Sequence, residues 1–266
     1  MSENPEASKE EDPLAGLTPP AGYDRIVLLD RHRHAGMGID PAARRAFQAR
    51  LSAIYLTVRE LIAAARFFPV AFVRDAGRDE FLPMAITGLV QGENLLLDAG
   101  GEWPADLYRP AYVRRFPFCT VRVRQEGAEQ APPQIVIAVQ ETALSAEARP
   151  VLFEGGEGRP SSAWREHEAL INEMEAAVEE TRAFCRNLVR LELLEPFEAH
   201  VQPKDLKALS VKGLHRIGEQ RLNALSGNAV AKLMKDGQLA RIYAHLFSLD
   251  NFGRLLDRYR RRKMSH

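Results

Sequence analysis

The chain has 266 residues, with 45% hydrophobic residues, 27% charged residues and a formal net charge of zero. This length suffices to bury a core in one large or two small domains, and the composition is that of an ordinary globular protein. Balanced charge argues against partners selected by net charge, such as nucleic acid or an anionic membrane surface. Because no window approaches about eighteen uninterrupted apolar residues, we expect no membrane span.

The N-terminal segment reads "MSENPEASKEEDPLAGLTPP". It is acidic, contains prolines and lacks the basic region and apolar core of a secretory signal peptide. Residues 1–20 are therefore expected to form a disordered tail, and the protein is expected to be cytoplasmic.

The first predicted elements follow this segment. The apolar run "YDRIVLLD" at 23–30 predicts a strand. "LTVRELIAAARFF" predicts a short helix with a capping box, in which Thr57 caps the amide of Glu60 and Glu60 reaches back. Pro69 ends this helix.

The middle of the chain is a succession of strand-like runs separated by Gly, Pro, Asp and Gln clusters. These runs are "PVAFVRD", "FLPMAITGLV", "ENLLLDAGG", "CTVRVRQ" and "QIVIAVQE". Their spacing is typical of antiparallel connections, so we expect a mainly antiparallel sheet in residues 21–158. Arg122 and Arg124 alternate with valines and are expected on the more solvated face.

The spacing of apolar residues changes after Ser161, from the period of two residues of a strand to the period of 3.6 residues of a helix. Apolar residues in "SSAWREHEALINEMEAAVEETRAFCRNLVRLELL" recur every three or four positions, which predicts one long amphipathic helix that Ser161 or Ser162 caps and Pro196 follows. "VKGLHRIG" predicts a strand, and the remaining runs to "RYRRRK" predict helices, one ending at Gly237.

These elements predict an α+β fold. We expect one domain at 21–256, with a β-rich part at 21–158 and an α-rich part at 159–256, followed by a basic tail at 257–266.

The segment "GEWPADLYRPAYVRRFPF", from Gly101 to Phe118, holds five aromatics, three prolines and three arginines. The prolines favour an irregular crossing over the sheet. Arginines beside aromatic rings suit recognition of a carboxylate, a phosphate or a peptide. In the alternative interpretation, the aromatics fill core and the arginines pair with Glu102 and Asp106. The candidate binding residues are Glu93, Asn94, Trp103, Tyr108, Tyr112, Arg114, Arg115 and His245.

Other patterns favour no cofactor or metal. His32 and His34 form an HxH pair for which no third ligand can be assigned, and an incidental loop is the simpler interpretation. Gly92, Gly100 and Gly101 indicate turns, because no phosphate-loop motif is present. Ser, His and Asp residues do not form a recognisable triad.

The remaining single residues also have structural interpretations. Cys119 and Cys185 lack CxxC spacing and are expected as buried reduced thiols. His245 lies beside an apolar helical stripe and is interpreted as a packing residue. The terminal "RYRRRK" is interpreted as a solvated helix end, with contact to the acidic tail as the alternative.

The chain resembles the SapC family of bacterial proteins. The resemblance is carried by "FFPVAFVRD", "FLPMAITGLVQGENLLLDAGGEWPADLYRPAYVRRFPF", "VLFEGGEG" and "GQLARIYAHLFSLDNFGRL", and it runs from about Tyr23 to Leu256. It implies an association with a bacterial surface layer, and it implies no reaction, cofactor or catalytic residue.

We therefore expect a non-enzymatic binding or accessory protein that engages a protein or peptide partner through Trp103 to Phe118. One alternative is an enzyme, or an enzyme subunit, acting on a peptide or an acidic small molecule, with His245 or Glu93 as acid or base. Another is a self-assembling structural protein. The sequence predicts no particular oligomeric state.

Overall fold

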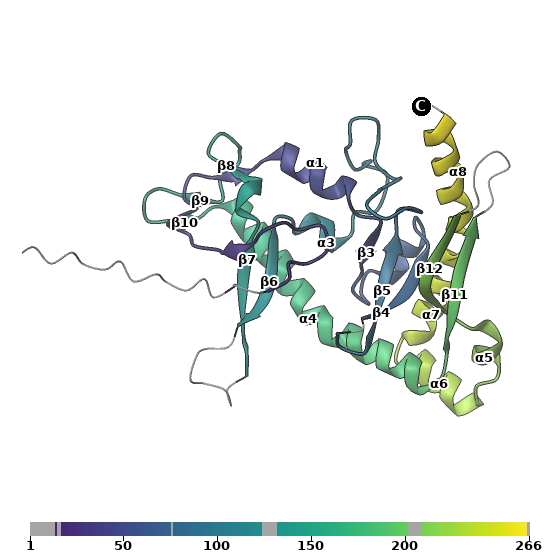
Figure 1. Cartoon of the computed structure of the whole chain (residues 1–266). Helices are drawn as coiled ribbons and strands as arrows, with labels where there is room; N and C mark the ends of the chain where they lie inside the picture. The colour runs from purple at the N-terminus through teal and green to yellow at the C-terminus, as the bar shows by residue number, and fades with distance from the viewer. Residues whose placement is uncertain (1–13, 15–16, 76, 124–131, 202–208, 265–266) are drawn as a thin grey trace, which may run out of the picture.

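The computed structural model describes residue 14 and residues 17–75, 77–123, 132–201 and 209–264. The fold is α+β, with antiparallel sheets in the first part of the chain and a helical C-terminal part (Figure 1). The first thirteen residues of the predicted acidic tail, and Arg124, lie outside the described residues.

The larger sheet has five strands in the order β11-β12-β4-β5-β3, and all of its pairings are antiparallel. The strands are β3 (Ala53–Tyr55), β4 (Val70–Asp75), β5 (Glu80–Ile86), β11 (Leu194–Val201) and β12 (Leu209–Ile217). The pairing of β12 with β4 joins Leu214 to Val73, so chain segments far apart in sequence share one sheet.

A smaller sheet has three strands in the order β1-β7-β6. These are β1 (Val27–Leu28), β6 (Phe118–Val123) and β7 (Gln134–Val139). Two further antiparallel pairs flank it, formed by β2 (Gly38–Ile39) with β8 (Leu144–Ser145) and by β9 (Phe153–Glu154) with β10 (Arg159–Pro160).

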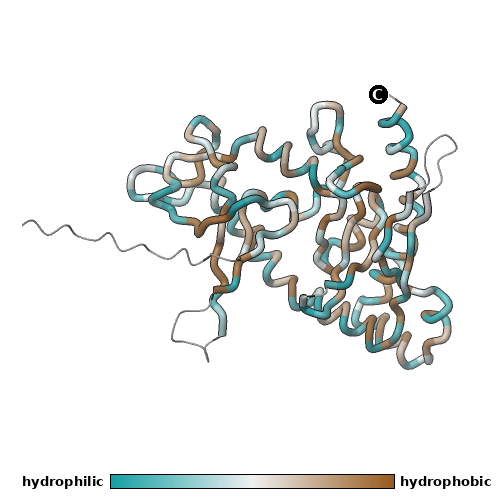
Figure 2. The backbone as a smooth tube through the Cα atoms, in the orientation of Figure 1, coloured by the Kyte–Doolittle hydropathy of each residue, from teal (hydrophilic) through white to brown (hydrophobic). Residues whose placement is uncertain are grey.

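The long helix α4 (Ser162–Arg190) runs diagonally from the smaller sheet to the larger one (Figure 1). Its start matches the prediction, because Ser161 Oγ accepts a hydrogen bond from the amide of Trp164 at 3.2 Å. Hydrophobic and hydrophilic residues alternate along it (Figure 2), and the predicted apolar positions include the buried Ile171 and Leu188. This one helix therefore contacts both sheets.

Shorter helices complete the chain. In the first part these are α1 (Pro41–Ala49), α2 (Leu61–Ala65), α3 (Ala111–Arg114) and the 3₁₀ turn η1 (Glu141–Ala143). In the C-terminal part they are α5 (Glu219–Asn223), α6 (Gly227–Lys235), α7 (Gln238–Ser248) and α8 (Asn251–Met264). Gly237 has a positive φ of 66° between α6 and α7, as expected for a residue that ends a helix.

Several elements differ from the sequence predictions. "ENLLLDAGG" forms turns and bends instead of a strand, because Asn94 and Asp98 bond to nearby backbone amides. The helix α1 and the strand β11 were not predicted. The predicted C-terminal helix is two helices, and α8 continues to Met264, through most of the predicted basic tail.

The buried residues form two clusters. The larger one lies around the five-stranded sheet and includes Trp103, and the smaller one includes Phe118 and Trp164 beside the three-stranded sheet. Cys119 and Cys185 are both free and buried. Within the described part of the chain, no helix combines the length and hydrophobicity that crossing a bilayer requires.

Candidate functional site

The aromatic side chains of the segment from Trp103 to Phe118 are mostly core residues. Trp103 Nε1 donates to the carbonyl oxygen of Tyr108 at 3.2 Å, and the ring of Phe116 stacks on that of Phe47 at 4.1 Å. Trp103, Tyr112 and Phe116 are all buried. This part of the segment matches the alternative interpretation, in which the aromatics fill core.

The carboxylate of Glu60 holds the segment in place. Its Oε1 accepts hydrogen bonds from Tyr108 Oη at 3.1 Å and from the amide of Ala111 at 2.7 Å. Its Oε2 accepts from the amide and the hydroxyl of Thr57, both at 2.9 Å. Glu60 therefore reaches back to Thr57 as predicted, while the hydroxyl of Thr57 donates to Glu60 instead of capping an amide.

The phenol of Tyr108 is consequently a structural group. Burial is the largest cause that raises its pKa above the usual range, and the charge of Glu60 adds to the effect. The hydroxyl stays protonated and remains available to donate to Glu60.

The two consecutive arginines at the end of α3, its last residue Arg114 and its C-cap Arg115, point in different directions. Arg114 is exposed, whereas Arg115 is partly buried and its Nε is buried without a hydrogen-bond partner among the described residues. The guanidinium of Arg115 lies over the ring of Tyr112, 4.6 Å from its centroid. Glu102, the predicted partner of the arginines, pairs instead with Arg45 at 3.0 Å.

Arg115 has no anionic partner among the described residues. Burial raises the pKa of Tyr112 to about 12 and that of Cys119 to about 11, although Arg115 lowers both. Burial also raises the pKa of Tyr23 far above its usual range. These neighbours stay neutral near pH 7. The hydroxyls of Tyr23 and Tyr112 hydrogen-bond to the guanidinium of Arg115, but no carboxylate among the described residues balances its charge, which is unfavourable in a protein interior.

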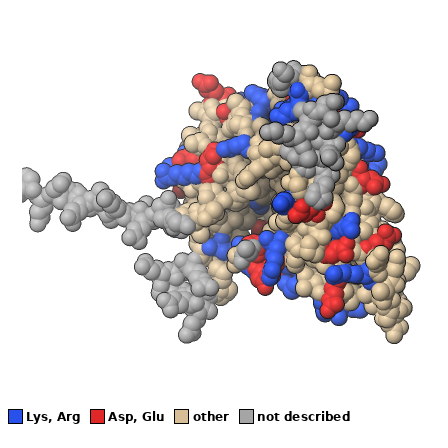
Figure 3. Space-filling view, turned by 45° about the vertical axis from the view of Figure 1, so that its right-hand side comes forward, with Lys and Arg blue, Asp and Glu red and all other residues tan. Residues whose placement is uncertain are grey.

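Arg115 lines a groove of about 530 Å³ between the two sheets, which we call the Arg115 groove. One wall is the face of the larger sheet that carries Tyr55 and Met84, and the opposite wall is β6. The helix α4 closes the groove from below with Glu175, Val178, Thr181 and Arg182. Figure 3 shows the molecular surface hollowed near the middle of the view, with charged side chains at the edge of the hollow.

The Arg115 groove is apolar with an excess of positive charge. Four arginines line it, at positions 78, 115, 122 and 182, against the two carboxylates Asp75 and Glu175. Arg182 is engaged by Glu80 at 3.2 Å. The volume of the Arg115 groove is within the usual range for ligand sites, and the charge of the groove favours a ligand with an anionic group and an apolar body.

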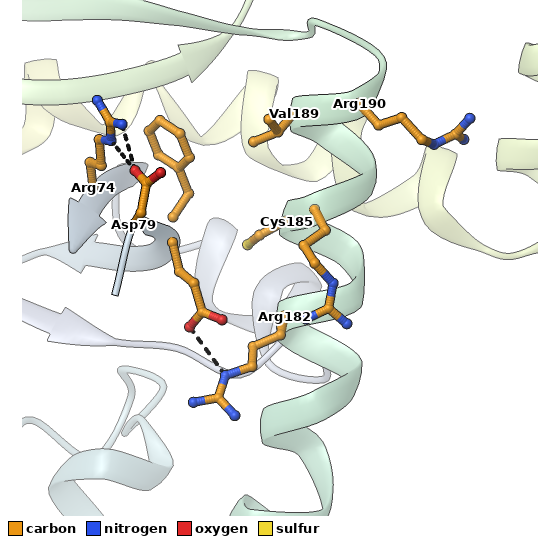
Figure 4. A pocket seen from close by; sticks show the side chains of 9 residues that line it. Arg74, Asp79, Arg182, Cys185, Val189 and Arg190 are labelled. Carbon is orange, nitrogen blue, oxygen red and sulfur yellow. Dashed lines mark hydrogen bonds and ion pairs between the residues drawn. The ribbon is translucent and has the colours of Figure 1, made fainter. Parts of the chain in front are cut away.

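A second pocket, of about 360 Å³, lies between α4 and the end of the β4–β5 hairpin (Figure 4). Three of its arginines are paired with carboxylates, Arg74 with Asp79, Arg182 with Glu80 and Arg186 with Glu179, and the fourth, Arg190, donates to Asn187 Oδ1. Burial raises the pKa of Cys185, on its wall, to about 12, so this thiol is a poor nucleophile. This second pocket therefore offers a ligand fewer buried charged groups without a partner than the Arg115 groove does.

The structure does not bring all of the predicted binding residues together. Tyr112 and Arg115 line the Arg115 groove, while Trp103 and Tyr108 lie behind it in the core. Asn94 Nδ2 donates to the carbonyl oxygen of Gln48 at 3.0 Å. Besides Trp103 and Tyr108, four of the eight predicted residues are not part of the groove wall: Glu93, Asn94, Arg114 and His245.

His245 is a packing residue, as interpreted from the sequence. Its Nε2 accepts a hydrogen bond from the amide of Ile217 at 3.0 Å, and its ring lies 5.1 Å from that of Phe72. Burial lowers the pKa of His245 to about 4, so the imidazole is neutral near pH 7.

The HxH pair is also split between two environments. His32 is exposed, while His34 is buried and its Nδ1 accepts from the amide of Asp30 at 3.1 Å. In the described residues, no group of three His, Cys, Asp or Glu side chains is arranged to hold a metal ion.

Sequence reasoning missed most of the groove wall. Alternation in "FLPMAI" places Leu82 and Met84 on one face of a strand, but it does not show what that face meets. Tyr55 lies in a strand that was not predicted, and Thr181 was assigned only to the buried face of a helix.

The family model described as SapC matches residues 29–255. This range contains β3, β5, α3, β6 and α4, which together form most of the Arg115 groove. No curated protein matches the chain, and no solved structure matches it.

Proposed function

The chain belongs to the SapC family, and from that premise we propose that it is a non-enzymatic binding protein that holds a protein or peptide partner in the Arg115 groove. The single observation that carries the proposal is the guanidinium of Arg115 in the wall of a largely apolar groove, where it pairs with no carboxylate of the described residues. A buried charge without a partner is costly, and a ligand carboxylate removes that cost by forming a forked, charge-assisted hydrogen bond.

The biological setting belongs to the same proposal. We place the binding event in the cytoplasm, in handling a peptide or protein of the bacterial surface layer. The two free, buried cysteines support a reducing compartment, and the SapC family membership motivates the surface-layer link.

The positions of His245 and Glu93 favour the binding proposal over the enzyme alternative, which assigned them as acid or base. His245 is neutral and packed against Phe72, and Glu93 lies 4.0 Å from Arg262, outside the Arg115 groove. The self-assembly alternative predicts oligomers whose size rises with protein concentration, which light scattering after size exclusion measures directly.

Arg114 provides a matched control for testing the proposal, because it is the same residue type one position earlier and is exposed. Wild type, Arg114→Gln and Arg115→Gln are each incubated with a random octapeptide mixture carrying free C-terminal carboxylates. We expect wild type and Arg114→Gln to enrich the same peptides, and Arg115→Gln to bind them about tenfold or more weakly.

Thermal unfolding of the three proteins separates loss of binding from loss of folding. Since Arg115→Gln removes an uncompensated charge, we expect its melting temperature to equal or exceed that of wild type. Equal binding by all three variants, or no enriched peptide at all, would overturn the proposal.

A further inference from the structure

The strand β6 has one free edge. It is the last strand of the sheet β1-β7-β6, so only one of its sides pairs with another strand of the described residues. On the other side, the amide of Phe118 donates to the carbonyl oxygen of Arg115 at 2.9 Å, and the carbonyl of Phe118 accepts from Tyr23 Oη at 2.6 Å.

The direction of the remaining backbone groups follows from this pattern. In an antiparallel pair, successive residues direct their amide and carbonyl groups alternately toward the partner strand and away from it. Because Phe118 bonds away from β7, Thr120 and Arg122 also direct theirs away from β7. Within the described residues, no partner meets the backbone amide or carbonyl of Thr120 or Arg122 on that side.

This free edge borders the Arg115 groove. Thr120, Val121 and Arg122 all line the groove, although neighbouring side chains of a strand point to opposite faces. The groove therefore contacts the edge of β6, and it also reaches Ile135 of β7 and residues 17, 18, 20 and 21 before β1. The unpaired backbone groups of Thr120 and Arg122 therefore border the same space as the guanidinium of Arg115.

The positive charge of Arg115 favours one orientation for a peptide strand that pairs with this edge. Arg115 lies beside the start of β6, because its carbonyl oxygen accepts the amide of Phe118. A strand that pairs antiparallel with β6 ends where β6 begins, so its C-terminal carboxylate arrives at Arg115. On the opposite wall, Tyr55 and Met84 are partners in the pairing of β3 with β5 and present an apolar surface.

We propose that the partner binds as an extended peptide that pairs antiparallel with the free edge of β6 and places its C-terminal carboxylate at Arg115. This inference rests on the proposed binding function and adds how the partner is held. Backbone hydrogen bonds to Thr120 and Arg122 supply affinity, and the apolar wall selects alternate side chains of the peptide.

The test uses octapeptides that the wild-type protein selects from the random mixture. Each is resynthesised with a single N-methyl amide at every position in turn, and once with a C-terminal amide in place of the carboxylate. We expect N-methylation to weaken binding about tenfold at every second position and much less between them, because only alternate amides face β6. Amidation is expected to weaken binding to wild type but not to Arg115→Gln.

A second measurement addresses β6 itself. Arg122→Pro removes an amide that faces away from β7, while Arg122→Ala removes the side chain and keeps the amide. We expect Arg122→Pro to weaken binding about tenfold and Arg122→Ala to have a smaller effect. Hydrogen exchange of the Thr120 and Arg122 amides in the wild-type protein is expected to slow when peptide binds.

The outcomes separate this inference from the proposed function. Binding that depends on Arg115 but tolerates N-methylation at every position would leave the proposed function in place and overturn strand pairing. Absence of any Arg115-dependent peptide would overturn both. A dimer of the chain that Arg122→Pro dissociates would show that a second copy covers the edge, which also overturns the peptide proposal.

Discussion

Adjacent residues of the same type have different roles in this protein. Arg114 is the last residue of the single helical turn α3 and Arg115 is its C-cap, still with helical backbone angles, so their side chains leave the helix about 100° apart. One extends into solvent, and the other lines the Arg115 groove without a carboxylate partner among the described residues. Glu60 is the opposite case, a buried carboxylate whose hydrogen bonds come from its own chain.

Glu60→Gln is expected to destabilise the protein. The carboxylate accepts four hydrogen bonds, from the amide and hydroxyl of Thr57, Tyr108 Oη and the amide of Ala111, and a glutamine NH₂ group faces one pair of these donors. We expect the free energy of unfolding, measured in urea, to fall by about 2–4 kcal/mol. Glu102→Gln, in an exposed ion pair, is the control and is expected to change it by less than about 1 kcal/mol. Equal effects from both substitutions would contradict the structural role of Glu60.

The buried histidine predicts how stability depends on pH. Burial lowers the pKa of His245 to about 4 in the folded protein, below the usual histidine value of about 6.5. Between these values the unfolded chain binds a proton that the folded protein does not. Stability is therefore present above about pH 6.5 and is lost as the pH falls toward 4, by on the order of 2–3 kcal/mol.

This prediction is tested with His245→Gln, whose free energy of unfolding in urea is compared at pH 7 and pH 4.5. The variant is expected to lose less stability than wild type over this interval. Burial also lowers the pKa of His167 to about 4, so the difference between the two proteins, and not the total loss, reports on His245. His32→Gln, at an exposed position, is expected to match wild type. An unchanged pH dependence in His245→Gln would refute the assignment.

At the scale of elements, the Arg115 groove forms where an edge, a face and a helix meet. The edge is β6, the face belongs to β3 and β5, and the helix is α4. Each of these elements has an ordinary local cause, such as alternation in the strands and a serine cap on α4. The groove lies in the space between these elements, because no strand in the described part of the chain pairs with the outward edge of β6.

Thr181 fixes the position of α4 against the loop before α2. Its hydroxyl donates to the carbonyl oxygen of Ala177 at 2.7 Å and accepts from the amide of Val58 at 2.8 Å. Thr181→Val keeps the shape of the side chain but leaves the buried Val58 amide without an acceptor. We expect it to lower the free energy of unfolding by about 1–3 kcal/mol in urea denaturation. Thr181→Ser keeps the hydroxyl and should cost less; a reversed order would contradict the hydrogen-bond explanation.

At the scale of the whole molecule, α4 joins two hydrophobic clusters into one structure. Its buried residue Ile171 belongs to the smaller cluster and Leu188 to the larger one. The strand β12 returns from the C-terminal part of the chain and pairs with β4. The larger sheet therefore needs the C-terminal part in order to form. Contacts of this kind are expected to couple the two clusters during unfolding.

The two tryptophans allow this coupling to be measured. Trp103 lies in the larger cluster and Trp164 in the smaller one. In Trp164→Phe and Trp103→Phe the remaining tryptophan reports on one cluster, and in each variant circular dichroism reports on the whole fold. We expect the fluorescence and circular dichroism midpoints to coincide within each variant. Midpoints about 1 M urea or more apart would show that the clusters unfold separately.

Local pattern was sufficient for much of the fold. The period of 3.6 and the serine cap predicted α4, and alternation predicted β4, β5, β6 and β7. Local pattern was insufficient where side-chain hydrogen bonds to the backbone take the place of strand pairing. At Asn94, an apolar run that was predicted as a strand forms a set of turns. The short strand β3 was missed because three residues carry too little pattern to identify.

The sequence by itself determined the α+β class, the SapC family and the irregular course of the segment that ends at Phe118. Only the tertiary structure decided which arginine faces the groove and which of the predicted binding residues lie together. Periodicity is a property of one element and its neighbours in sequence, and it specifies the face on which a side chain lies. The surroundings of that face depend on contacts between segments far apart in the chain, such as Arg115, Tyr55 and Thr181 around one groove.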